Sequence, residues 1–146
     1  MGILITNNQS VWPIRPLSIK RRLNKVLKAL NQAEADFTAL ITDDQSILAL
    51  NLEFRGLNKA TNVLAFPNGQ PFPREKGRYL GDVALSMETV QREALAADRP
   101  LGEVFYFYLI HGLLHLLGYD HALGPKEEAA QEAQEKRLLA LIPHEL

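Results

Sequence analysis

The segment from Gly102 to Leu117 constrains the fold most, because it is apolar on every side. Residues 104–110 read Val-Phe-Tyr-Phe-Tyr-Leu-Ile without interruption. A helix that is hydrophobic all round belongs inside a protein rather than on its surface. The chain has 146 residues, and a chain of this length buries roughly 68–70% of its unfolded surface. The sequence therefore predicts one domain, residues 1–146, built around a central buried helix.

Hydrophobic periodicity and turn residues divide the rest of the chain into short elements. Apolar, β-branched stretches predict four strands, at 2–7, 37–42, 61–66 and 79–86. Periodic apolar faces with helix caps predict five helices, at about 18–30 with Ser18 as cap, 44–55, 87–98, 102–117 and 125–141. This order predicts an α+β (mixed α/β) fold, in which a four-stranded mixed sheet is packed with about five helices.

Three of the four histidines follow an H-x3-H-x5-H pattern at the end of the apolar segment. His111 and His115 lie one helical turn apart, with Cβ atoms about 5–6 Å from each other. Gly118 can adopt a positive φ, end the helix and turn His121 back toward the same point. The pattern predicts one metal ion held by three imidazoles; a cluster of packed core histidines is the alternative.

The ligand type and number indicate what such a metal site could do. Neutral imidazole suits zinc, while nickel, copper and iron stay open as alternatives. Three protein ligands leave the fourth tetrahedral position open, which is typical of catalytic rather than structural zinc. The spacing matches that of metzincin peptidases, but Gly112 stands where zinc peptidases carry a glutamate base, and no methionine follows His121. This disfavours peptide hydrolysis and favours a phosphodiester substrate.

Composition limits the environment and the partners. The absence of cysteine excludes disulfides and thiolate ligands and agrees with a reducing compartment. No leader or membrane-length apolar run is evident, so a soluble, cytoplasmic protein without membrane contact is expected. The net charge is −1, yet the residues before Glu34 carry six basic side chains and no acidic ones. These form either a solvated helix face or a surface that attracts RNA.

Four motifs in the same order resemble the YbeY family of bacterial metallo-endoribonucleases over nearly the whole chain. They are Leu50–Gly56, Thr61–Pro67, Leu80–Ser86 and His111–His121. The resemblance implies a zinc-dependent endoribonuclease specific for single strands, which acts in ribosomal RNA processing at the 3′ end of the small-subunit RNA and in ribosome quality control. It implies single-stranded RNA and the small ribosomal subunit as partners, and no DNA. It places one zinc ion on His111, His115 and His121, and the functional arginine at Arg55.

Alternatives remain for each assignment. Arg55 ends a predicted helix, where its charge would complement the helix dipole without any catalytic role. The Pro67–Arg78 segment, with Arg74, Lys76 and Arg78, is either an RNA-contacting flap or an ordinary surface loop. The whole chain could instead be a metallopeptidase-like hydrolase, or a non-enzymatic RNA- or ribosome-binding module whose zinc is structural. A fourth protein ligand would favour the structural zinc.

Overall fold

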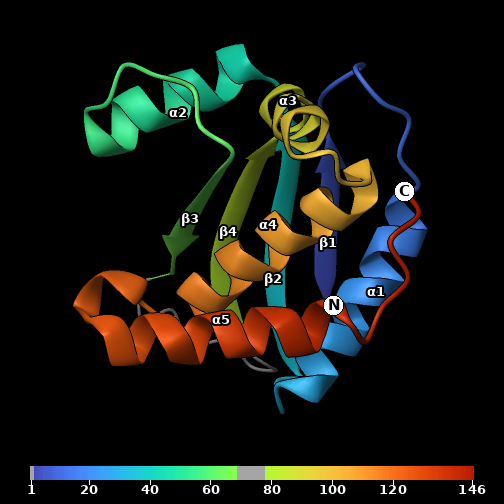
Figure 1. Ribbon diagram of the computed structural model, residues 1–146, viewed down its shortest axis with the longest axis vertical. Helices are drawn as coiled ribbons and strands as arrows, with labels where there is room; N and C mark the ends of the chain where they lie inside the picture. The colour runs from blue at the N-terminus through green and yellow to red at the C-terminus, as the bar shows by residue number, and fades with distance from the viewer. Residues whose placement is uncertain (1, 69–77) are drawn as a thin grey trace.

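A mixed sheet and helices form the fold of the computed structural model, which describes residues 2–68 and 78–146 (Figure 1). The described strands are β1 (Ile3–Asn7), β2 (Ala35–Thr42), β3 (Val63–Pro67) and β4 (Arg78–Ser86). The described helices are α1 (Pro16–Ala29), α2 (Asp44–Arg55), α3 (Met87–Ala97), α4 (Leu101–Leu116) and α5 (Pro125–Leu139), with a short 3-10 turn, η1 (His121–Leu123). The predicted α+β class and element order are confirmed.

The strands lie in the order β1-β2-β4-β3, as Figure 1 shows. The pairs β1–β2 and β2–β4 are parallel, whereas β3 runs antiparallel to β4 and forms one edge. The sheet is therefore mixed, as predicted. Since the two faces of a strand alternate, each strand sends side chains both to the main core and to the opposite face.

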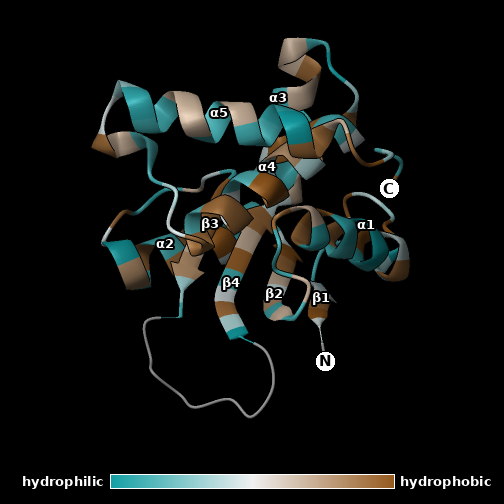
Figure 2. Ribbon diagram, turned by 90° about the horizontal axis from the view of Figure 1, so that it is seen from below, coloured by the Kyte–Doolittle hydropathy of each residue, from teal (hydrophilic) through white to brown (hydrophobic). Residues whose placement is uncertain are grey.

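Helix α4 is the centre of the main core. Figure 2 shows it between the sheet and α5, and most of its side chains are buried. Phe105, Tyr106, Leu109 and Ile110 are fully enclosed together with residues of α1, α3 and the inner faces of β2 and β4. The prediction of a central buried helix is confirmed. A helix packed this firmly gives rigid support to the two histidines at its end.

The opposite face of the sheet is covered much less. A small second cluster there is formed by Ile47, Leu64 and Ala84, with Leu40, Leu50, Ala60 and Phe66 packed against it. Among the described helices only α2 contributes to this cluster. Helix α2 therefore lies across the sheet from α4, and its C-terminal end lies beside edge strand β3.

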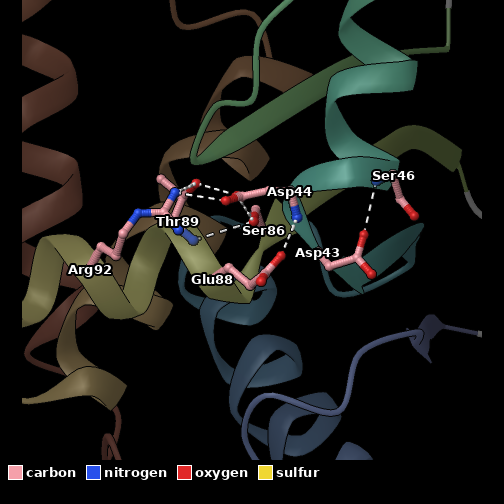
Figure 3. A network of polar contacts seen from close by, with 7 residues as sticks. All are labelled: Asp43, Asp44, Ser46, Ser86, Glu88, Thr89 and Arg92. Atoms are coloured by element: carbon pink, nitrogen blue, oxygen red, sulfur yellow. Dashed lines mark hydrogen bonds and ion pairs between the residues drawn. The ribbon is translucent and has the colours of Figure 1, made fainter.

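Hydrogen bonds fix the start of α2 to α3 (Figure 3). Asp43 caps α2 by accepting from the backbone N–H of Ser46 at 2.9 Å. The Asp44 carboxylate accepts from the hydroxyls of Ser86 and Thr89, both at 2.6 Å, and pairs with Arg92 at 2.7 Å. Although burial alone would raise the pKa of Asp44, these three partners hold it below its usual value. This anchoring sets the direction of α2.

One expectation from the sequence is wrong, and another concerns residues that lie mostly outside the described ranges. The predicted cap at Ser18 is wrong, because α1 begins at Pro16, with Arg15 in the capping position. Proline suits the first helical turn, where its missing N–H leaves no hydrogen bond unmade. Most of the predicted 67–78 loop, including Arg74 and Lys76, lies outside the described residues.

In the described part of the chain, no helix is both long and apolar enough to cross a bilayer.

Candidate metal centre

The three predicted ligands meet at the C-terminal end of α4. His111 and His115 project from successive turns, and their Nε2 atoms lie 3.1 Å apart. The His121 ring centroid lies 5.8 Å from that of His111 and 5.4 Å from that of His115. We call these three residues the histidine cluster.

The turn that returns His121 to the helix is made as the sequence predicts. Gly118 has a φ of +99° and donates its N–H to the His115 carbonyl at 3.1 Å, while Tyr119 donates to the Leu114 carbonyl at 3.0 Å. This pair of bonds is the Schellman arrangement that ends many helices. Asp120 then caps η1 by accepting from the Ala122 N–H at 2.9 Å, so its side chain supports the turn that carries His121.

The cluster has the dimensions of a divalent metal site. One donor nitrogen from each ring lies within 4.8 Å of the others. Ligands about 2.0–2.1 Å from a tetrahedral zinc are separated from each other by roughly 3.4 Å, close to the observed spacing of His111 and His115. No fourth histidine or carboxylate joins this group in the described part of the chain. The residues therefore fit a metal ion with an open coordination position.

Behind the cluster, α5 supplies a buried carboxylate that the sequence analysis did not single out. Glu135 is only 5% exposed, and its carboxylate contacts Nδ1 of His111. Gln131, one turn earlier and also buried, places its amide nitrogen 3.1 Å from the same Nδ1 and 3.4 Å from Glu135. The contact at Nδ1 leaves Nε2 of His111 directed at the cluster, which is how carboxylates orient metal-binding histidines.

A sequence signal for Glu135 exists in retrospect. Gln131, Glu135 and Leu138 follow i, i+4, i+7 spacing, which places them on one face of α5, and all three are buried. The other glutamates of α5 are exposed. A carboxylate on the apolar side of a helix needs a partner, and His111 provides it.

Electrostatics favour a neutral His115. Burial lowers the pKa of His115, and the neighbouring His111 and His121 rings lower it further, against an opposing hydrogen bond to the backbone of Tyr119. A neutral imidazole is the form that binds a metal. At neutral pH, the environment of His115 therefore favours the ligand form.

One cavity brings Arg55 together with the histidines. It has a volume of about 600 Å³, and its wall includes the whole histidine cluster, the Gly118–Ala122 turn and β3. Arg55, the last residue of α2, lines the same cavity, because Gly56 ends the helix there with a φ of +70°. Within residues 2–68 and 78–146, Arg55 forms no ion pair. We call this cavity the metal cleft.

The structure gives a steric reason for Gly112. A Cβ atom at this position would lie 2.7 Å from Val83 Cγ1 and 3.3 Å from Val63 Cγ2. Gly112 thus faces the sheet and lets α4 approach β3 and β4 closely. A glutamate side chain would meet these valines, so the general base of zinc peptidases has no room here. The likeness to metzincins remains one of histidine spacing.

We expect Gly112→Ala to lower the free energy of unfolding. Overpacking a close contact costs about 1–3 kcal/mol, whereas alanine gains about 1 kcal/mol over glycine in a helix. Chemical denaturation of the variant measures the difference. Adding Val83→Ala, which removes the colliding methyl groups, is expected to make the double variant more stable than the sum of the two single effects. Simple additivity would contradict the assigned contact.

The basic N-terminal cluster is partly structural. Arg22 donates to the Tyr106 hydroxyl at 3.0 Å and lies 5.6 Å from the centre of that ring. It also pairs with Glu145 at 3.6 Å. Arg22 therefore joins α1 to the core and the C-terminal residues, and the other basic residues of α1 remain available for either predicted role.

Comparisons with known proteins agree with this architecture. The family model for endoribonuclease YbeY matches residues 4–142. Proteins named Endoribonuclease YbeY are similar to this chain in Magnetococcus marinus (41% identity, 75% of this chain and 80% of the relative), Syntrophus aciditrophicus (34%, 97% and 90%) and Syntrophotalea carbinolica (37%, 99% and 99%). The solution structure of TM1509 from Thermotoga maritima shares the fold, with a TM-score of 0.68 at 23% identity over 94% of this chain and 86% of that one. The chain belongs to the endoribonuclease YbeY family.

Proposed function

We propose that this chain is a zinc-dependent endoribonuclease, a single functional domain that cleaves single-stranded RNA. The observation that carries the proposal is the metal cleft, where Arg55 and the three histidines line one cavity. The names of the relatives support the reaction and its RNA substrate. We further propose ribosomal RNA at the 3′ end of the small subunit as the natural target, a role in ribosome quality control, and the cytoplasm as the location.

Each residue has a distinct proposed role. His111, His115 and His121 would hold one zinc ion, and the ion would supply Lewis-acid chemistry at the open end of the cluster. The Arg55 guanidinium donates hydrogen bonds to two oxygens of the scissile phosphate and orients the phosphate beside the histidine cluster. Its fixed charge stabilises the negative charge that develops in the transition state. Glu135 is a positioning residue that acts through His111.

The first test of this function uses one RNA sequence, once as a single strand and once as a duplex. Purified protein of known metal content is incubated with the RNA as a single strand and as a duplex, with chelator and with zinc added back. We expect cleavage of the single strand only, lost with chelator and restored by zinc. Equal cleavage of both forms, or cleavage that survives metal removal, would contradict the proposal.

We expect Glu135→Gln to weaken zinc binding by about 10–100-fold, the usual cost of altering the partner behind a metal-binding histidine. The amide keeps the shape of the carboxylate but loses the negative charge that contacts Nδ1 of His111 and orients this ring. Competition with a chromogenic chelator measures the affinity. Glu132→Gln, on an exposed position of the same helix, is the matched control and should bind zinc normally. Unchanged affinity in Glu135→Gln would remove the positioning role.

A further inference from the structure

The metal cleft continues beyond Arg55 onto the other face of the sheet. A cavity of about 830 Å³ lies between α2 and this face, with Leu50 and Phe54 on the helix side. On the sheet side it is lined by Thr6, Thr38, Leu40, Asp82 and Ala84. We call it the sheet groove. Arg55, Ala65 and Pro67 line both the groove and the metal cleft, so the two cavities meet at edge strand β3.

An exposed aromatic side chain stands at this junction. Phe54 directly precedes Arg55 and is 61% exposed, although it packs against Phe66 with ring centroids 5.2 Å apart and planes inclined by 60°. The core therefore does not enclose Phe54, and its ring is open to a ligand. Exposed aromatic side chains are common stacking surfaces for the unstacked bases of single-stranded nucleic acid.

The charges of the sheet groove suit a base rather than a phosphate. Of the described residues that line it, Arg55 is the only cation and Asp82 the only anion. Arg55 lies at the mouth shared with the metal cleft, whereas Asp82 lies on β4 and would repel a phosphate. The Tyr79 hydroxyl hydrogen-bonds the Asp82 carboxylate and lies 3.2 Å from the Thr38 hydroxyl, which orients this polar group. A carboxylate can accept from an amino or imino group on a base edge.

We propose that the sheet groove is a nucleobase subsite for the nucleotide next to the cleaved bond. With the scissile phosphate on Arg55, that nucleotide passes around β3, stacks its base on Phe54 and turns its polar edge toward Asp82. This inference rests on the proposed function and adds to it a reason for single-strand specificity. A base held in a duplex remains stacked and paired, so it cannot enter the groove.

The test compares Phe54→Ala with Leu95→Ala, which truncates another exposed apolar residue, on α3 and outside both cavities. We expect Phe54→Ala to raise the KM for a short single-stranded RNA about tenfold, a factor within the range that stacking of one base on an aromatic ring typically contributes. Zinc content and thermal unfolding should stay near those of the parent protein. Leu95→Ala should leave KM unchanged. Phe54→Leu keeps the apolar packing against Phe66 and should still raise KM.

An abasic scan separates a base subsite from a general loss of affinity. In the parent protein, removal of the base at one position beside the cleaved bond should raise KM about tenfold. The Phe54→Ala variant should be insensitive to that same removal. Equal sensitivity of both proteins at every position, or a normal KM for Phe54→Ala, would overturn the subsite while leaving the nuclease intact. If Phe54→Ala no longer associated with ribosomes but cleaved RNA normally, the subsite would also be overturned, because the groove would then bind a protein rather than a nucleobase. Failure of the parent protein to cleave any RNA would instead refute the proposed function.

Discussion

Arg55→Ala is expected to slow cleavage of single-stranded RNA by about 10²–10³-fold, the loss typical when one preorganised donor to a developing negative charge is removed. The structure places Arg55 in the metal cleft at the end of an anchored helix, within the same cavity as the histidine cluster. It makes no metal contact in the proposed arrangement. Zinc content should therefore stay at one ion per chain, as elemental analysis would measure.

Two comparisons separate catalysis by Arg55 from a structural role. The charge of Arg55 at the end of α2 contributes about 0.3–1 kcal/mol through the helix dipole, so a purely structural residue would alter thermal unfolding slightly and cleavage hardly at all. Arg55→Lys keeps the charge but cannot bond two phosphate oxygens in the planar manner of a guanidinium. We expect it to recover only part of the rate. Normal cleavage by Arg55→Ala would refute the assignment.

His115→Ala is expected to abolish both zinc binding and RNA cleavage under conditions where the parent protein is fully loaded. His115 supplies one of only three donor nitrogens in the cluster. Its loss should therefore weaken zinc binding by more than the roughly 10–100-fold expected when an orienting partner such as Glu135 is altered. Equilibrium zinc binding and cleavage of the same RNA measure the two effects together.

The fourth histidine provides the matched control. His144 lies near the C-terminus, with its Nε2 atom 2.8 Å from the Leu139 carbonyl, and it is not part of the histidine cluster. His144→Ala should retain zinc and cleavage. If His115→Ala kept full zinc occupancy, the ion would have to bind elsewhere. If it lost zinc but still cleaved RNA, the metal would not serve the reaction.

Local sequence signals predict much of this fold because they act within single elements. The apolar residues of α4 required burial, the glycine after α2 ended that helix, and Gly118 turned the chain back toward α4. The spacing of His111 and His115 followed from helix geometry alone. Each of these features depends on residues a few positions apart, and the structure confirms them.

Features formed by distant segments could not be predicted in the same way. Glu135 reaches His111 only because α5 packs on α4, and Gly112 is required only because Val63 and Val83 lie beneath it. The direction of α2, which brings Arg55 to the metal cleft, depends on the bonds of Asp44 to α3 and the preceding Ser86. The sheet groove exists because helices pack unequally on the two faces of the sheet. Such contacts are set by tertiary packing rather than by local propensity.

The most direct test of the account is X-ray absorption spectroscopy of the zinc-loaded protein in solution, with the His115→Ala variant in parallel. We predict three imidazole nitrogens about 2.0–2.1 Å from the ion, and one further oxygen that does not come from a side chain. A fourth side chain on the ion, or the same spectrum from His115→Ala, would contradict a three-histidine catalytic site.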